Sequence, residues 1–188
     1  MVTEAEARRL RPFMSGIVAL VVAVAATMVW YFMGRPDETP VPVRTVDWSA
    51  WVKAGRADHR LALFAPDALP KGWRATSASY VGGNDPRFEI GMLTEDGKYV
   101  GIVESESSVR TLVRQNIDDK AERGEDVTLN DTTSAWQVWT DSGGDYGVAL
   151  DVENPDGTSE TVLVFGSAPD DEIRDFAATL RPGTVPLS

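Results

Sequence analysis

The longest run of apolar and uncharged residues in the chain extends from Met14 to Met33. As a helix it would be about 30 Å long, which is the thickness of the hydrocarbon core of a bilayer. A helix on the surface of a globular domain carries charged residues on its outer face, and this run has none. We therefore predict a transmembrane helix at residues 14–33, in direct contact with membrane lipid.

Three arginines, Arg8, Arg9 and Arg11, precede this run. Basic residues on a short tail beside the first membrane span keep that tail in the cytoplasm. We therefore predict a single-pass protein of the plasma membrane. Residues 1–13 would form its cytoplasmic tail, and the C-terminal domain would be extracytoplasmic.

A cleaved secretory signal is the alternative, because Ala23-Val24-Ala25 has the small-x-small pattern that signal peptidase reads. The apolar run continues beyond this pattern, however. Trp30 and Tyr31 also lie where an aromatic belt would meet the outer headgroups. An uncleaved anchor is therefore the favoured interpretation.

Beyond the span, the pattern changes to that of a stalk and a globular domain. Residues 34–44 contain three prolines and predict an extended, semi-rigid stalk. Residues 45–182 are enough for one domain, and residues 183–188 form a C-terminal tail. Helical spacing is expected at 45–57, at 170–180, and between a cap at Ser107 or Ser108 and an end at Gly124. Short β-branched or aromatic runs predict strands at 60–64, 74–80, 88–93, 99–104, 136–140, 146–152 and 160–165.

These elements follow the same order twice. Gly82-Gly83 and Asp96-Gly97 recur as Gly143-Gly144 and Asp156-Gly157, offset by 61 and 60 residues. Each half is expected to run strand, glycine turn, strand, Asp-Gly turn, strand and helix. We infer two β-β-β-α pseudo-repeats, either from duplication or from convergence on common turn chemistry.

The alternation of side chains places Trp136 and Val138 on one face of their strand, and Gln137 and Trp139 on the other. Both faces of the sheet therefore need cover, which predicts an antiparallel sheet with helices on each side, an α/β/α sandwich. One of these tryptophans left exposed as a partner-binding anchor is the alternative.

Trp48 and Trp51 are three residues apart in the first helix of the domain. Packing against the sheet is the expected role of this pair, and an interfacial membrane foot is the alternative. A candidate interaction surface therefore comprises Trp48, Trp51, Trp136 and Trp139.

The charge of the chain is −11, and 14 basic and 27 acidic residues follow position 36. Such a domain is repelled by phosphate backbones and by anionic lipid headgroups, so nucleic-acid binding is not expected. The chain has no cysteine, which excludes disulfides, thiolate metal sites and lipidation of an N-terminal cysteine.

Recognisable catalytic sets are missing from the sequence. His59 is the only histidine, and no Gly-x-Ser-x-Gly motif accompanies it. The acidic pairs 118–119, 125–126 and 170–171 lie at expected helix ends or loops, where they cap, solvate or complement the helix dipole. We therefore predict no catalytic residues, no metal site and no cofactor.

Several motifs resemble a family of actinobacterial single-span membrane proteins that share a domain of unknown function, DUF4245. They are Pro40-Val41-Pro42-Val43-Arg44, Leu69-Pro70-Lys71-Gly72-Trp73, Thr94-Glu95-Asp96-Gly97-Lys98 and Ala177-Ala178-Thr179-Leu180-Arg181. The resemblance implies an envelope setting and assigns no functional residues. The order of the elements is also similar to that of PsbP/Mog1-like sandwiches.

Three functions remain open from the sequence. The favoured hypothesis is a non-enzymatic interaction module of the cell envelope with a protein partner. A hydrolase or transferase acting on cell-wall glycans through a carboxylate pair is the second, and it predicts a cleft with one acid of raised pKa. A binder of a small apolar ligand is the third, and it requires a cavity of several hundred Å³.

Overall fold

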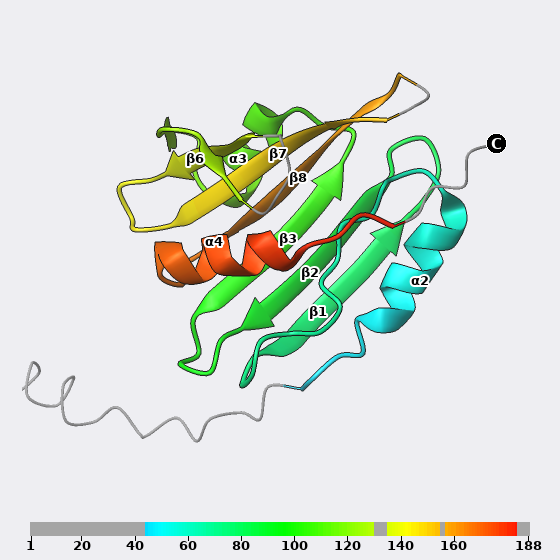
Figure 1. The fold of residues 1–188 in the computed structure, drawn as a ribbon, viewed down its shortest axis with the longest axis horizontal. Coiled ribbons are helices and arrows are strands. Elements are labelled where there is room, and N and C mark those ends of the chain that lie inside the picture. The colour runs from blue at the N-terminus through cyan, green and yellow to red at the C-terminus, as the bar shows by residue number, and fades with distance from the viewer. Residues whose placement is uncertain (1–43, 130–134, 155–156, 184–188) are drawn as a thin grey trace, which may run out of the picture. The chain divides into compact units, whose positions relative to one another are not determined.

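The computed structural model describes residues 44–129, 135–154 and 157–183 (Figure 1). From Arg44 on, the described residues form one compact unit. The predicted cytoplasmic tail, the membrane helix at 14–33 and almost the whole stalk lie outside these residues. Within the described part of the chain, no helix is both long enough and apolar enough to cross a membrane.

The described domain has a mixed α+β fold with three helices and eight strands. The helices are α2 (Ser49–Asp58), α3 (Val109–Asn116) and α4 (Asp170–Thr179). The strands are β1 (Arg74–Val81), β2 (Arg87–Leu93), β3 (Tyr99–Ser105), β4 (Glu122–Arg123), β5 (Val127–Thr128), β6 (Ala135–Thr140), β7 (Tyr146–Glu153) and β8 (Ser159–Gly166).

All strand pairs in the sheet are antiparallel, in the order β1-β2-β3-β8-β7-β6. The short strands β4 and β5 both pair with β6, one after the other along its outer edge. The first three-strand meander and the last three-strand meander therefore lie side by side, joined by β3 and β8.

The register of the sheet repeats at the offset expected from the sequence. Ile90 of β2 faces Ile102 of β3, and sixty positions later Leu150 of β7 faces Val162 of β8. The predicted pseudo-repeat is therefore present in the strand pairing as well as in the order of the elements.

The turns of the two hairpins repeat as well. In the first hairpin, the N–H of Gly97 donates to the carbonyl of Thr94 at 3.0 Å, and in the second the N–H of Gly157 donates to that of Asn154 at 2.9 Å. Both glycines have positive φ, 76° and 82°. The expected role of the two Asp-Gly turns is thus confirmed for their glycines.

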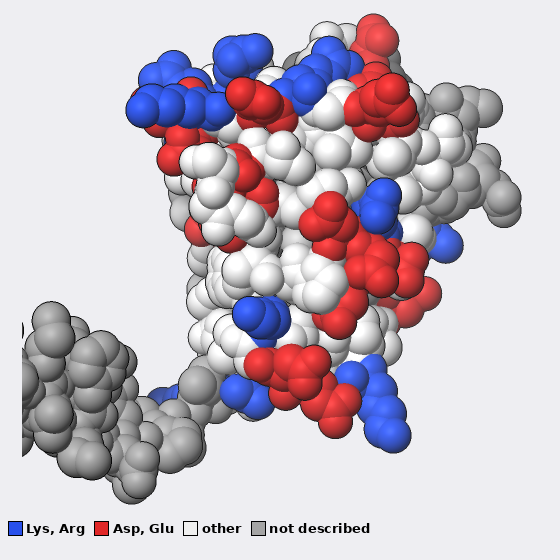
Figure 2. Space-filling view, turned by 90° about the vertical axis from the view of Figure 1, so that its left-hand side faces the viewer, with Lys and Arg blue, Asp and Glu red and all other residues white. Residues whose placement is uncertain are grey.

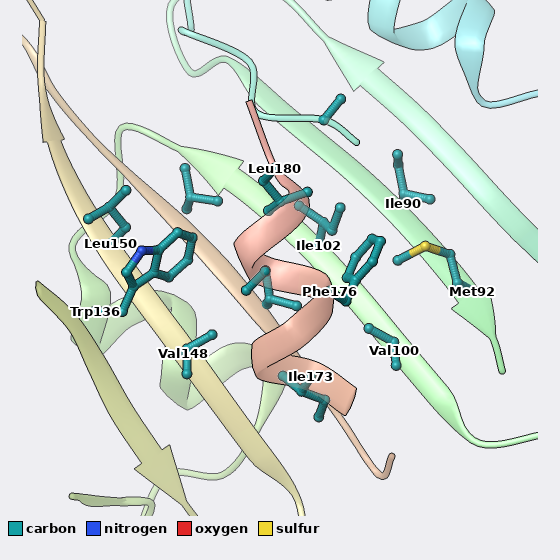
Figure 3. Packing of buried hydrophobic residues seen from close by; sticks show 14 of the residues in the cluster. Ile90, Met92, Val100, Ile102, Trp136, Val148, Leu150, Ile173, Phe176 and Leu180 are labelled. Atoms are coloured by element: carbon teal, nitrogen blue, oxygen red, sulfur yellow. The ribbon is translucent and has the colours of Figure 1, made fainter. Parts of the chain in front are cut away.

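Helices cover both faces of the sheet. Val52 of α2 and Ile173, Phe176 and Ala177 of α4 belong to the larger core cluster, on the face that also carries Trp136. Figure 3 shows Phe176 beside Val100 and Ile102 of β3. Val109, Leu112 and Val113 of α3 pack with Trp139 in a second cluster on the opposite face. In Figure 1, α4 crosses in front of the sheet and α3 lies behind β7 and β8.

The helices break the symmetry of the pseudo-repeat. Each follows the third strand of its unit, yet α3 and α4 pack on opposite faces. The burial of Trp136 and Trp139, which are 2% and 3% exposed, follows directly from this arrangement. The expectation that both faces of their strand need cover is confirmed.

Two local predictions were wrong. Residues 60–64 form no strand, because Leu63 adopts a left-handed conformation with a φ of 54°. The helix after Ser108 ends at Asn116 rather than at Gly124. The side chain of Asp118 accepts the N–H of Lys120 at 2.7 Å, and this turn takes the place of further helix.

Candidate functional site

A surface pocket of about 400 Å³ lies between the segment before β1, the β2–β3 turn and α4. Its volume is within the range of small-ligand sites. The lining consists of aromatic, acidic and small polar side chains and a single lysine: Pro70, Lys71, Trp73, Thr94, Glu95, Asp96, Glu172, Asp175, Phe176 and Thr179.

The aromatic wall of the pocket depends on a tight turn. The N–H of Trp73 donates to the carbonyl of Pro70 at 3.0 Å, and Gly72 between them has a φ of 82°. A β-turn with positive φ at its third residue favours glycine there. This turn brings the ring of Trp73 against that of Phe176, with centroids 5.0 Å apart. Since Phe176 is buried in the core, it fixes the position of the half-buried Trp73.

The acidic wall comes from two separate elements. Glu95 and Asp96 occupy the middle of the β2–β3 turn, which is closed by the hydrogen bond from Gly97 to Thr94. Glu172 and Asp175 lie on α4, whose buried residues face the core and leave these two carboxylates toward the pocket. In the described part of the chain, no salt bridge engages any of the four.

Figure 2 views the side of the molecule from which the β2–β3 turn and the N-terminal end of α4 project. Acidic side chains gather in several groups on this side, and basic ones lie along its upper edge and also beside the acidic groups lower down. An aromatic surface bordered by solvated carboxylates attracts cations, both by charge and through the face of the ring. Among the described residues, no group of three or more His, Asp or Glu side chains is arranged to hold a metal ion.

A second acidic feature lies inside the domain. Glu104 of β3 and Glu160 of β8 are 0% and 1% exposed. Both point to the face of the larger core cluster, on adjacent strands and in diagonal register, since Glu104 faces Val162. Two neighbouring buried acids are unusual unless other groups satisfy them.

Backbone N–H groups of the segment after α2 satisfy this pair. The N–H groups of Leu63 and Phe64 donate to the two oxygens of Glu104 at 2.6 and 2.7 Å. The N–H of Ala62 is shared between both oxygens of Glu160, at 3.0 and 3.1 Å. Three successive N–H groups around a left-handed residue form a concavity of hydrogen-bond donors, which here is filled by the carboxyl groups of Glu104 and Glu160.

Burial raises the pKa of Glu104 to about 8, and the nearby charge of Glu160 acts in the same direction. The N–H groups of Phe64 and Leu63 and the charge of Arg56 oppose this rise. A raised pKa is a mark of catalytic acids, but this carboxyl has no solvent exposure and both of its oxygens are occupied. We interpret the pair as a clamp for the segment 62–64.

The four predicted surface tryptophans occupy different environments. Trp136 and Trp139 are buried on opposite faces of β6. Trp48 is half-buried and packs against the larger cluster, whereas Trp51 is 39% exposed. The structure does not bring the four together, so the interaction surface remains a prediction only for the tryptophans around α2.

The remaining candidates from the sequence lie at the surface. His59 is exposed and ends α2 in a left-handed conformation. Asp119, Glu125, Asp126, Asp170 and Asp171 are likewise exposed, and Asp118 is half-buried in its turn.

Sequence reasoning missed the pocket and the buried pair. Glu104 has a signal in hindsight, because it continues the inward alternation of Val100 and Ile102 at a position where an apolar residue is expected. The pocket has no comparable signal, since its residues come from three segments that meet only in the folded chain.

A family model described as "Protein of unknown function (DUF4245)" matches residues 9–180. The chain belongs to this family. No curated protein matches the DUF4245 chain. Two solved structures are similar at 15% identity and a TM-score of 0.37: the complex of Pseudomonas aeruginosa MucA and MucB, and MucB in complex with MucA(peri). The match covers 64% of the DUF4245 chain and only 35% and 36% of the MucB-complex chains, about a third of their length.

Proposed function

We propose that the DUF4245 domain is a non-enzymatic binding module of the cell envelope that captures a positively charged segment of a partner protein in the pocket beside α4. The observation that carries this proposal is the pocket itself, in which Trp73 stands among four carboxylates. The family resemblance makes an actinobacterial envelope the expected setting. From the element order we also propose that the sandwich is PsbP/Mog1-like.

The location is part of the same proposal. Residues 14–33 would hold the domain at the outer face of the plasma membrane, because a run of this length without charge suits a membrane span and Arg8, Arg9 and Arg11 precede it. Residues 34–44 would then keep the domain within reach of other proteins at that surface.

A basic peptide suits the chemistry of the pocket better than the other ligand classes. An ammonium or guanidinium group over an indole ring gains about 0.5–1 kcal/mol at an exposed site. Exposed ion pairs add roughly 0.2–1 kcal/mol each, so several must act together. A weak affinity, in the high micromolar to millimolar range, is therefore expected. A small apolar ligand would leave Lys71 as the only basic residue of the lining to face Glu95, Asp96, Glu172 and Asp175.

The glycan hydrolase hypothesis requires a carboxyl group of raised pKa in an open cleft. Glu104 has a raised pKa, but it does not line a cleft. A glycosidic oxygen must approach the general acid to within hydrogen-bond distance. Glu104 is completely buried under the segment 62–64. The acids that do line the pocket are exposed, apart from the half-buried Glu172, which is the environment of ordinary solvated carboxylates.

Titration of the full-length chain in lipid nanodiscs with labelled peptides tests the proposal. A nine-residue peptide of alternating lysine and glycine is expected to bind, and its glutamate counterpart is not. Trp73→Ala and a Glu172→Gln/Asp175→Asn double variant should each weaken binding by roughly two- to tenfold. Asp119→Asn, which removes a carboxylate far from the pocket lining, is the matched control and should bind as the wild type does.

Equal binding of the basic and acidic peptides, or equal affinities of the wild type and the pocket variants, would contradict the proposal. Binding of muropeptide or glycan fragments in place of the lysine peptide would favour the carbohydrate hypothesis instead.

A further inference from the structure

The outward face of α2 is unusually apolar for a helix at the surface of an acidic domain. Val52 and Gly55 are buried toward the sheet. The opposite face presents Ala50, Ala54 and Ala57, all of which are exposed, with Lys53 among them. A solvent-facing helix surface normally carries several charged residues of both signs, and this face carries one lysine.

Trp51 stands at the border of this face and is 39% exposed. In the described residues it is one of three large hydrophobic side chains exposed to this extent, the others being Val81 and Tyr99. Its neighbour Trp48 packs against the core, so the helix is fixed on the domain while Trp51 remains accessible. Tryptophan prefers the headgroup region of a bilayer, where its apolar ring and its N–H group are both accommodated.

The segment that contains α2 carries a charge opposite to that of the remaining domain, and one of its basic residues, Arg60, is paired with Glu106 after β3 at 3.2 Å. Residues 44–60 contain four basic and two acidic side chains, whereas residues 61–188 contain ten basic and 23 acidic ones. Both acids near the helix are turned to partners within the domain. Asp47 accepts hydrogen bonds from the N–H and hydroxyl groups of Ser49, and Asp58 accepts the hydroxyl hydrogen of Tyr80 at 2.7 Å.

The predicted membrane span and the short stalk would also place α2 close to the membrane surface. The predicted span ends at Met33, and the eleven residues 34–44 can extend at most about 35–40 Å. The helix is the first element after this stalk. A tether of such length keeps a surface at millimolar effective concentration near its target, so a weak affinity for lipid is sufficient.

We propose that the outward face of α2, with Trp51 and Lys53, rests on the anionic phospholipid surface of the membrane that carries the chain. This inference depends on the proposed membrane anchor and adds a second contact that the anchor itself does not require. Apolar alanines allow the helix to approach the headgroups closely, Trp51 enters the interface, and Lys53 and Arg56 meet the lipid phosphates.

The absence of cysteine from the chain allows a direct test. A single cysteine introduced by Ala54→Cys in the full-length protein carries an environment-sensitive dye, and Gln115→Cys on α3 serves as the matched label on the opposite face of the sheet. The protein is inserted into nanodiscs of phosphatidylcholine with phosphatidylglycerol and a headgroup nitroxide lipid. Quenching at position 54 is expected to exceed that at 115 severalfold, and to fall in discs without phosphatidylglycerol.

Charge variants separate a lipid contact from mere proximity. Lys53→Glu should lower the fraction of molecules in which α2 lies on the lipid, and with it the quenching at position 54, since each basic residue near an anionic surface strengthens binding about fivefold. Arg114→Glu, a charge reversal of an exposed residue on α3, should leave quenching at position 54 unchanged.

Flotation of the unlabelled chain with liposomes separates the two proposals. A chain that floats but shows equal quenching at positions 54 and 115 overturns the lipid contact and leaves the anchor in place. A chain that does not float overturns the anchor and the lipid contact together. Quenching at position 54 that is insensitive to both lipid charge and Lys53→Glu also contradicts the proposed contact.

Discussion

The backbone N–H of Leu63 donates a hydrogen bond of 2.6 Å to the side chain of Glu104. Leu63 is completely buried and has a φ of 54°, a conformation that a branched, bulky residue rarely adopts. The carboxyl group of Glu104 therefore holds a strained turn against the centre of the sheet.

The pH dependence of stability should report this contact. Folded Glu104 keeps its proton up to about pH 8, whereas the unfolded chain releases it near the ordinary value of 4.5. The folded state thus binds more protons between these values, and the free energy of unfolding falls as pH rises through this window. The loss is on the order of 5 kcal/mol, or roughly 15 °C in melting temperature.

Glu104→Gln is the matched variant for this prediction. Its side chain cannot titrate, so thermal unfolding measured in mild detergent from pH 5 to pH 9 should show a flatter pH profile than the wild type, whatever the absolute melting temperature. Parallel profiles of the two proteins would show that Glu104 does not carry the effect.

Gly55→Ala should destabilise the domain although alanine is the better helix former. A Cβ at this position would overlap the side chain of Leu63 and lie 2.8 Å from the ring of Tyr80. Overpacking of this kind costs about 1–3 kcal/mol, more than the roughly 1 kcal/mol that helix propensity returns. Urea unfolding gives the difference. Ala54→Gly on the exposed side is the control for propensity alone, and a more stable Gly55→Ala variant would refute the close packing of α2 on β1.

The two Asp-Gly turns should respond equally to substitution. Gly97 and Gly157 both have positive φ, and an added Cβ would meet nothing within 4 Å at either position. Gly97→Ala and Gly157→Ala are therefore each expected to cost about 1–2 kcal/mol, from backbone conformation alone. Chemical denaturation of the two variants side by side tests this. Costs that differ by more than about 1 kcal/mol would mean that the two turns are not energetically equivalent.

Binding of the lysine peptide should weaken with salt. The screening length falls from about 10 Å at 0.1 M salt to about 3 Å at 1 M, which removes most of the attraction by exposed carboxylates. Fluorescence titrations of the full-length chain in nanodiscs at both salt concentrations should show that the affinity for the peptide falls about tenfold or more. The affinity of Trp73→Ala should fall by a similar factor between the two concentrations. Binding that strengthens with salt would point to an apolar ligand.

Much of the sheet could be predicted from local patterns. The turn at Asp96-Gly97 requires positive φ at one position, and hydrophobic alternation in the neighbouring strands sets their faces, so the hairpin follows from short-range rules. Trp136 and Trp139 predicted the two-sided cover correctly because a strand sends successive side chains to opposite faces.

The segment 60–64 shows why other parts could not be predicted. Its apolar residues and Phe64 resemble a strand. The N–H groups of Leu63 and Ala62, however, bond to side chains more than forty positions away along the chain instead of to another strand. No local pattern contains that information. The pocket is similar, because Trp73 reaches Phe176 across the sequence only after α4 has packed on the sheet. Long-range partners decide both features.

The placement of α3 and α4 on opposite faces has a consequence for how the domain can be divided. Each pseudo-repeat unit supplies three strands and the helix that follows them, and this helix shields only one side of the joint sheet. Helix α2, which precedes the first unit, adds cover on the face that carries α4. Without its counterpart, the first unit would lack the cover of α4 and the second unit would lack that of α3, so part of the hydrophobic surface of the sheet would be open to water. Each unit therefore depends on the other to bury its side of the sheet, and neither is expected to fold stably alone.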